Sequence, residues 1–203
     1  LQKVLTWVNY SKGDYLVFTP NKKIKDDSRF NSEIMKLVGY YLAEGYITAN
    51  DSVVNFALNK NETKYISEIE KLIYQITKKY SSKRIRGNVA EIRVCSRKWA
   101  DFFKKVAGKY AHKKKLADEI LTLPFKKQWA MVETYIKGDG CLTWRRKNSN
   151  PRYEITTASK NLAIQTQEIL ARGRIFSSIR RRKKDESRNH IEGRVVDAKP
   201  VYD

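Results

Sequence analysis

Two acidic residues in this chain, each followed directly by glycine, stand at the ends of two apolar helical patterns. Glu44 closes a pattern that begins near residue 32, and Asp139 closes one that begins near residue 125. If these helices pack side by side with their carboxyl ends together, the two carboxylates meet where each helix dipole is negative. That arrangement is unfavourable unless a cation lies between them. We therefore expect Glu44 and Asp139 to bind a divalent metal ion.

The metal ion expected at this pair is Mg²⁺ or Mn²⁺, because carboxylate, carbonyl and water oxygens are their preferred ligands. The helix-terminal carbonyls of Ala43 and Gly138 are further candidate ligands. A bound metal ion polarises a phosphodiester and activates water, which is the chemistry of metal-assisted hydrolysis. A single acidic residue followed by glycine is explained more simply as the end of a helix, without any function. Two in register, each opening a copy of one structural unit, favour a functional site.

The charge of the chain indicates a polyanionic partner. Lys and Arg number 42 against 22 Asp and Glu in 203 residues, a formal net charge of +20. Residues 1–110 and residues 111–203 each carry +10, so the charge is not confined to a basic tail. Nucleic acid is the first candidate partner. A merely solvated basic surface is the plain alternative.

Composition excludes several classes of protein. The longest apolar run, residues 37–43, is too short to span a bilayer, and we expect no signal peptide and no membrane partner. Hydrophobic residues make up 41% of the chain, too many for a disordered basic protein. Cys95 and Cys141 form no CxxC pair, and His112 and His190 are the only histidines, which argues against zinc or Ser-His-Asp chemistry. We expect an intracellular location, in the cytoplasm or nucleoid.

The hydrophobic periodicity alternates between helix and strand in two successive stretches. The first stretch predicts helices at 32–43, 62–79 and 99–106, and strands at 54–59, 83–86 and 89–95. The second predicts helices at 125–137 and 159–171, and strands at 141–147, 152–157, 175–182 and 199–202. Further predictions are strands at 4–8 and 15–19, a helix at 114–121 and a charged loop at 183–193.

The order of these elements divides the chain into an N-terminal strand extension (1–30), a first unit (31–123) and a second unit (124–203). The second unit has no partner for the helix at 99–106, so we expect its carboxyl end to be incomplete. We expect Ile85 to face the core, Cys95 and Cys141 to be small buried residues, and Lys113–Lys115 to contact phosphate or solvent.

The nine residues Leu37–Gly45 (LVGYYLAEG) resemble the motif of the LAGLIDADG homing endonucleases. Residues 132–140 (VETYIKGDG) resemble a second, more degenerate copy, and the resemblance covers about residues 30–203 in element order. It implies an α+β fold of two pseudo-symmetric αββαββα units. The motif helices would form the interface between the units, and antiparallel sheets would form a saddle over the DNA major groove. The resemblance also implies a monomer in which Glu44 and Asp139 bind the metal ions and place the hydrolytic water.

Two positions depart from the family pattern. Thr134 stands where the family often has a smaller residue for close helix contact, and Lys137 replaces an acid that is not catalytic. The resemblance further implies polar and basic residues around the carboxylates. Asn59 and Lys60 match the end of the first long strand, and Lys160 is the symmetric candidate. A lysine there would stabilise phosphate charge or polarise water, or simply open a helix on a solvated face.

A two-stranded ribbon fits the major groove, and arginine is suited to guanine O6 and N7. The polar faces of the predicted strands carry the candidate DNA-binding residues Asn55, Arg84, Arg86, Arg93, Arg145, Arg152, Thr156, Arg180 and Arg182. Some of them are expected to be phosphate anchors or surface charges instead.

The sequence as a whole predicts a site-specific, metal-dependent double-strand DNA endonuclease with a long recognition site. The resemblance implies that its products have short 3′ overhangs. Because Leu1 is no splicing nucleophile and the chain does not end in His-Asn, we expect an intron-encoded, free-standing endonuclease and not an intein. Two alternatives stay open: an RNA maturase that assists intron splicing, and a catalytically inactive DNA-binding regulator of the same fold.

Overall fold

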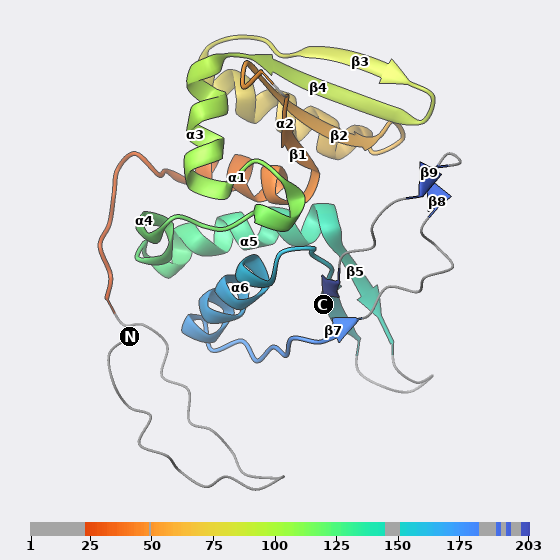
Figure 1. The fold of residues 1–203 in the computed structure, drawn as a ribbon. Coiled ribbons are helices and arrows are strands. Elements are labelled where there is room, and N and C mark those ends of the chain that lie inside the picture. Colours follow the sequence, from red (N-terminus) through yellow and green to blue (C-terminus); the bar gives the residue numbers. More distant parts are fainter. Residues whose placement is uncertain (1–22, 49, 145–150, 183–189, 192–193, 196–199) are drawn as a thin grey trace, which may run out of the picture.

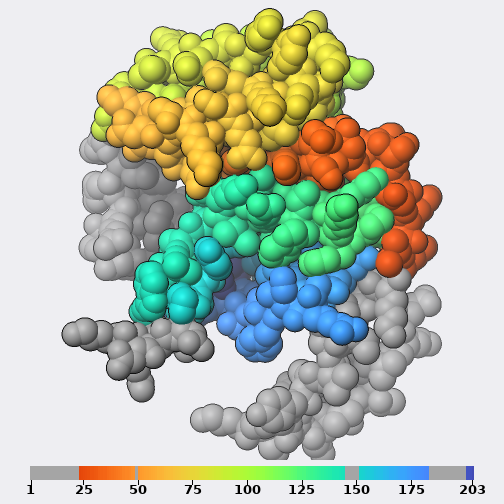
Figure 2. Space-filling model, turned by 180° about the vertical axis from the view of Figure 1, so that it is seen from behind, coloured from red at the N-terminus to blue at the C-terminus, as the bar shows by residue number. Residues whose placement is uncertain are grey.

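Two helices, α1 (Ser32–Glu44) and α5 (Phe125–Asp139), lie against each other at the centre of the molecule (Figure 1). The computed structural model describes residues 23–48, 50–144, 151–182, 190–191, 194–195 and 200–203. From behind, the yellow and orange first half and the blue α6 lie on opposite sides of the teal α5 (Figure 2). The two halves of the molecule therefore meet through this helix pair.

The first half follows the order helix, two strands, helix, two strands, helix. After α1 come β1 (Gly45–Ile47), β2 (Val53–Asn59), α2 (Thr63–Thr77), β3 (Ser82–Arg86), β4 (Val89–Cys95) and α3 (Arg97–Ala107). The four strands form an antiparallel sheet in the order β1-β2-β4-β3. A short connection with η1 (Ala111–Lys113) and α4 (Asp118–Leu121) leads to the second half.

The second half repeats the order as far as its last strand. After α5 come β5 (Gly140–Thr143), β6 (Arg152–Ile155), α6 (Lys160–Arg172), β7 (Arg181–Arg182), β8 (His190–Ile191), β9 (Arg194–Val195) and β10 (Val201–Tyr202). β5 pairs with β6, β10 pairs with β7, and β8 pairs with β9. A bridge between Thr157 and Tyr202 joins the first two pairs, so the order β5-β6-β10-β7 mirrors the sheet of the first half.

The α1 helix begins and ends through local backbone chemistry. The Asn31 side chain accepts a hydrogen bond from the backbone N–H of Ile34, which satisfies one of the free donors at the helix start. At the other end Gly45 turns to an extended conformation and leads directly into β1. Glu44 is consequently the last helical residue, held between a buried helix and a paired strand.

Alternation along β2 supplies the core of the first half. Val54, Phe56 and Leu58 are buried against the helices. The ring of Tyr41 in α1 stacks on Phe103 of α3 at a centroid distance of 4.5 Å, and both contact Phe56 edge-on. This aromatic cluster anchors the sheet to α1, whose end carries Glu44.

Small side chains let α1 and α5 approach closely. A Cβ atom added to Gly39 would lie 2.0 Å from Thr134 Oγ1 and 2.1 Å from the Met131 carbonyl oxygen. The Thr134 hydroxyl donates to the Lys36 carbonyl of α1 at 2.8 Å. The threonine that departs from the family pattern is thus accommodated, and it bonds across the interface.

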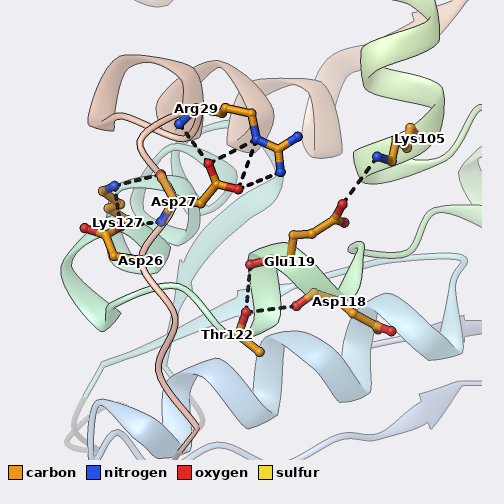
Figure 3. A network of polar contacts seen from close by, with 8 residues as sticks. All are labelled: Asp26, Asp27, Arg29, Lys105, Asp118, Glu119, Thr122 and Lys127. Atoms are coloured by element: carbon orange, nitrogen blue, oxygen red, sulfur yellow. Dashed lines mark hydrogen bonds and ion pairs between the residues drawn. The ribbon is translucent and has the colours of Figure 1, made fainter.

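Ion pairs reinforce the opposite end of this interface (Figure 3). Lys127 of α5 pairs with Asp26 at 2.5 Å and donates to the Asp27 carbonyl at 3.0 Å, while Arg29 binds the Asp27 carboxylate. The segment before α1 is thereby tied to the start of α5, which fixes the relative position of the two motif helices.

The fold class expected from the sequence is confirmed, with three local differences. The predicted helix at 114–121 is helical only in α4, because the backbone N–H groups of Lys115 and Ala117 bond to carbonyls at the end of α3. The strand predicted at 175–182 is reduced to β7, which pairs only with the last residues of the chain. The predicted loop at 183–193 contains β8, which pairs with β9.

Three buried-residue predictions are wrong. Ile85 is 59% exposed because β3 is the edge strand of its sheet. Cys95 and Cys141 are both exposed; Cys95 is the last residue of β4, and Cys141 lies in the short strand β5, where its neighbour Leu142 is exposed as well. The strands predicted at 4–8 and 15–19 lie outside the described residues. No helix among the described residues is long and apolar enough to cross a membrane.

Candidate active site

The ends of the two central helices bring Glu44 and Asp139 to one place. A Cβ atom added to Gly138 would lie 2.4 Å from the Ala43 Cβ atom and 3.8 Å from Glu44 Oε1. The glycine before Asp139 is therefore required for α5 to pass this close to Glu44. Both helices turn at the following glycine into a strand, so the two carboxylates lie where helix pair and sheets meet.

The surroundings of both carboxyl groups disfavour the ionised form. Burial, followed by the charges of Asp139 and Glu62, raises the pKa of Glu44 to about 7, although the charge of Lys114 acts in the opposite direction. Burial likewise raises the pKa of Asp139 to about 6. Two partly buried acids with raised pKa values in one place are typical of a catalytic or cation-binding site.

A buried lysine supplies the positive charge at this pair. Lys114 is 5% exposed, and its ammonium donates to the carbonyls of Tyr41 at 2.8 Å and Leu42 at 2.7 Å in the last turn of α1. Burial lowers the pKa of Lys114 to about 8, although the charges of Asp139 and Glu44 act in the opposite direction. Lys114 therefore satisfies the helix end and partly neutralises the acids. The prediction that this lysine contacts phosphate or solvent is wrong.

The donor set of this site fits a hard divalent cation. Two carboxylates in a half-buried setting, with one ammonium beside them, leave an excess of negative charge when all three are ionised. Among the described residues, no cluster of three or more His, Cys, Asp or Glu side chains is present, so water or backbone carbonyls would complete the coordination. The carbonyls of Ala43 and Gly138 remain the candidates.

Of the three polar residues expected around the carboxylates, Asn59 ends β2, Lys60 lies in the turn before α2, and Lys160 begins α6. Lys60 is exposed, and its ammonium donates to the Gly87 carbonyl at 3.2 Å in the β3–β4 turn. Asn59 is exposed and its side chain accepts from the backbone of Asn61. Lys160 is the exposed first residue of α6. Lys114, which the sequence did not single out, is the lysine whose charge acts on both acids.

The polar face of the first sheet carries the predicted arginines in adjacent rows. Arg84 pairs with Glu91 across the strands, and Arg93 pairs with Asn55. Asn55 is only 2% exposed between its cross-strand neighbours, so it has little surface to offer a ligand. Arg86, by contrast, is exposed at the edge.

In the second half, the candidate DNA-binding residues bond to acids of the same surface. Arg152 pairs with Glu154, and Arg182 pairs with Asp203 and donates to Thr156. Arg180 also pairs with Asp203, at 3.4 Å. Arg145 lies outside the described residues. These side chains are thus oriented by neighbours before any ligand binds.

Sequence reasoning missed Lys114, Tyr46 and Glu91. A run of three lysines resembles a surface charge patch, and only the apolar positions after it, such as Leu116, hinted that one of them turns inward. Tyr46 follows the first motif directly, and its hydroxyl donates to Glu91 at 3.0 Å. That contact spans 45 residues and has no local sequence signal.

Comparison with known proteins shows which family and which solved structures this chain is similar to. Residues 126–202 match the family described as a LAGLIDADG-like domain. The structure of I-DmoI in complex with DNA and Ca is similar with a TM-score of 0.54, covering 84% of this chain and 80% of that chain at 16% identity. I-WcaI bound to its DNA recognition sequence gives a TM-score of 0.53, covering 85% and 75% at 13% identity. These likenesses show the fold.

The curated relatives are much longer proteins. An iron-sulfur cluster assembly SufBD family protein of Mycobacterium tuberculosis is 27% identical over 196 residues, 95% of this chain and 23% of that protein. A DNA polymerase of Thermococcus litoralis is 31% identical over 162 residues, 75% of this chain and 8% of that protein. The chain spans less than a quarter of the length of these relatives.

Proposed function

We propose that this chain, whose residues 126–202 match the LAGLIDADG-like domain family, is a site-specific, divalent-metal-dependent homing endonuclease that cuts both strands of DNA. The observation that carries the proposal is the pair Glu44 and Asp139 at the ends of packed motif helices, both with raised pKa values. The net charge of +20 supports double-stranded DNA as the substrate. We also propose that the protein is a monomer and that it acts inside the cell.

Each residue of the site has a role in this proposal. Glu44 and Asp139, with the carbonyls of Ala43 and Gly138, would hold Mg²⁺ or Mn²⁺. When bound, the metal ion supplies Lewis-acid polarisation of the phosphodiester and a lowered pKa for the attacking water. The ionised carboxylates orient that water. Lys114 holds the end of α1 in place and limits the repulsion between the acids.

Three exposed polar residues before or at the start of α2 and α6 complete the proposed site. Asn59, Lys60 and Lys160 are proposed to contact the scissile phosphates or their water, since cations aimed at developing phosphate charge stabilise the transition state. The arginines of both sheets are proposed to contact DNA in the major groove or at phosphates. Arg84, Arg86 and Arg93 would serve one half of the site, and Arg152, Arg180 and Arg182 the other.

The proposal is tested by selecting bound sequences from randomised duplex DNA and then exposing the enriched duplex to Mg²⁺, to Mn²⁺ and to EDTA. We expect cleavage of both strands with short 3′ overhangs, only with metal ion. The variants Glu44→Gln and Asp139→Asn should bind the duplex and leave it whole. Glu133→Gln, an equal change of charge on an exposed position of α5, should cut like the wild type.

Other outcomes would support the alternatives. Specific binding of DNA without cleavage in any metal ion would favour a regulator of the same fold. Uncut DNA together with accelerated folding of a group I or similar intron RNA would favour a maturase. In both cases the endonuclease proposal would be refuted.

The genetic setting is also a proposal. An intron-encoded enzyme was the expectation from the sequence, but the relatives have unrelated names and carry the matching segment as 8% and 23% of their length. This pattern favours a segment inserted in the reading frame of a host protein. Sequencing the flanks of the gene tests this: in-frame host coding sequence on both sides is expected, and intron boundaries would contradict it.

A further inference from the structure

One carboxylate stands among the arginines on the polar face of the first sheet. Glu91 lies in β4, with Arg84 directly opposite it in β3 and Arg93 two residues further on the same strand. Its Oε2 atom is 3.9 Å from Nε of Arg86, and its side chain is 16% exposed. A carboxylate repels phosphate groups, so its presence is unexpected on a basic face that binds only phosphates.

The position of Glu91 is set by a second residue. The Tyr46 hydroxyl donates to Oε1 of Glu91 at 3.0 Å, and Tyr46 itself is exposed on the same face. A carboxylate offers about four acceptor sites, and among the described residues Tyr46 is its only hydrogen-bond donor. Oε2 lies beside Arg86. It can still accept a hydrogen bond, because no described side chain donates one to it.

Glu91 is also close to the candidate active site. Gly45, the residue after Glu44, pairs with Phe56, and Phe56 pairs with Ile92, the neighbour of Glu91. Adjacent strands lie about 4.8 Å apart, so Glu91 is roughly 10 Å across the sheet from the end of the first motif. A duplex placed for cutting at Glu44 would therefore present its central base pairs to Glu91.

We propose that Glu91 is a specificity-determining residue that accepts a hydrogen bond from an exocyclic amino group in the major groove, and that Tyr46 and Arg86 position it. The inference rests on the proposed function. A carboxylate only accepts, so it favours cytosine N4 or adenine N6 and disfavours the keto oxygens of guanine O6 and thymine O4. Cytosine is the first candidate. Phosphates are left to the surrounding arginines.

The test is a binding selection from randomised duplex DNA with Ca²⁺ present, in which the base profile of each variant is compared with that of the wild type. The wild type should prefer cytosine or adenine at one central position by about tenfold. Glu91→Gln should lose that preference and keep all other positions, because an amide both donates and accepts. Tyr46→Phe, which removes only the positioning hydroxyl, should weaken the preference without abolishing it.

Matched variants separate base reading from charge and folding. Glu119→Gln makes the same change of charge on α4, where Glu119 pairs with Lys105 at 3.3 Å (Figure 3), and should keep the wild-type profile. Glu91→Asp retains a carboxylate and should keep a weakened preference for the same bases. Urea unfolding of each variant shows whether a lost preference accompanies a folded protein.

The outcomes distinguish this inference from the proposed function. If the wild type enriches a sequence and Glu91→Gln gives the same profile, or only a uniform loss of affinity, the specificity role is refuted and the endonuclease proposal stands. The specificity role is also refuted if the position at which Glu91→Gln loses its preference is one where the wild type prefers guanine or thymine. If the wild type enriches no sequence, both proposals fail.

Discussion

Replacing Asp139 with asparagine is expected to stabilise the metal-free protein at neutral pH, although it removes a proposed metal ligand. The pKa of Asp139 is raised from 3.8 to about 6, so ionisation is less favourable in the folded than in the unfolded chain. Below pH 3.8 the carboxyl group is protonated in both states and has no effect. As the pH rises through 6, the wild type loses stability that the asparagine variant keeps.

The magnitude follows from the rise of about 2 in the pKa of Asp139. At ~1.4 kcal/mol per pKa unit this corresponds to ~3 kcal/mol. Solvent screening of the partly exposed carboxylate reduces it, and Lys114 loses one of its two anionic neighbours in the variant. We therefore expect Asp139→Asn to gain about 1–2 kcal/mol at pH 7, which is roughly 2–8 °C in Tm for a domain of this size.

The assay is urea unfolding of both proteins in EDTA at pH 4, 5, 6 and 7. The difference in unfolding free energy should grow from near zero at pH 4 to its full value at pH 7. Glu133→Gln serves as the control on α5: it breaks an exposed ion pair with Lys137 and should be neutral or slightly destabilising at every pH.

Metal ion should reverse the order of stability. Adding Ca²⁺ or Mg²⁺ should stabilise the wild type by about 2.7 kcal/mol at a hundredfold excess over Kd, and should stabilise Asp139→Asn much less. If Asp139→Asn is less stable than the wild type in EDTA at pH 7, the argument that burial holds the Asp139 carboxyl group against ionisation is refuted.

Three further predictions concern the framework of the site. Gly39→Ala should destabilise the protein by roughly 1–3 kcal/mol in urea unfolding, because the new Cβ atom overlaps Thr134 and a backbone carbonyl; an unchanged midpoint would contradict the close helix contact. Lys114→Met should cost about 2 kcal/mol in the same assay, since two carbonyls of α1 lose a charged donor, and it should slow cleavage; wild-type behaviour in both would remove Lys114 from the site. Asp51→Asn should lower Tm at pH 7 by breaking the bonds to Lys104 and Lys109. The gap should narrow as the pH falls below 3.8 and close near pH 2, because the pKa of the wild-type carboxyl is lowered from 3.8 to about 2; a pH-independent gap would refute this cause.

The sequence predicted the helices and most strands because their signals are local. The apolar spacing before Glu44 and before Asp139 is helical, and alternation from Val54 to Leu58 identifies a strand with one buried face. Element boundaries were missed where long-range pairing decides them. The strand predicted at 175–182 shortened to two residues because only its end finds a partner strand.

What the sequence determined by itself was the identity of the acidic pair and the repeat that places it, because a motif and its copy are linear patterns. Only the tertiary structure decided which cation stands beside that pair. Lys114 is one of three consecutive lysines, and burial at the end of α1, which the helix-to-helix packing creates, separates it from its neighbours. The same holds for Glu91, whose proposed role depends on Tyr46, 45 residues away. Contacts between distant segments have no counterpart in local sequence, so they emerge only when the chain is folded.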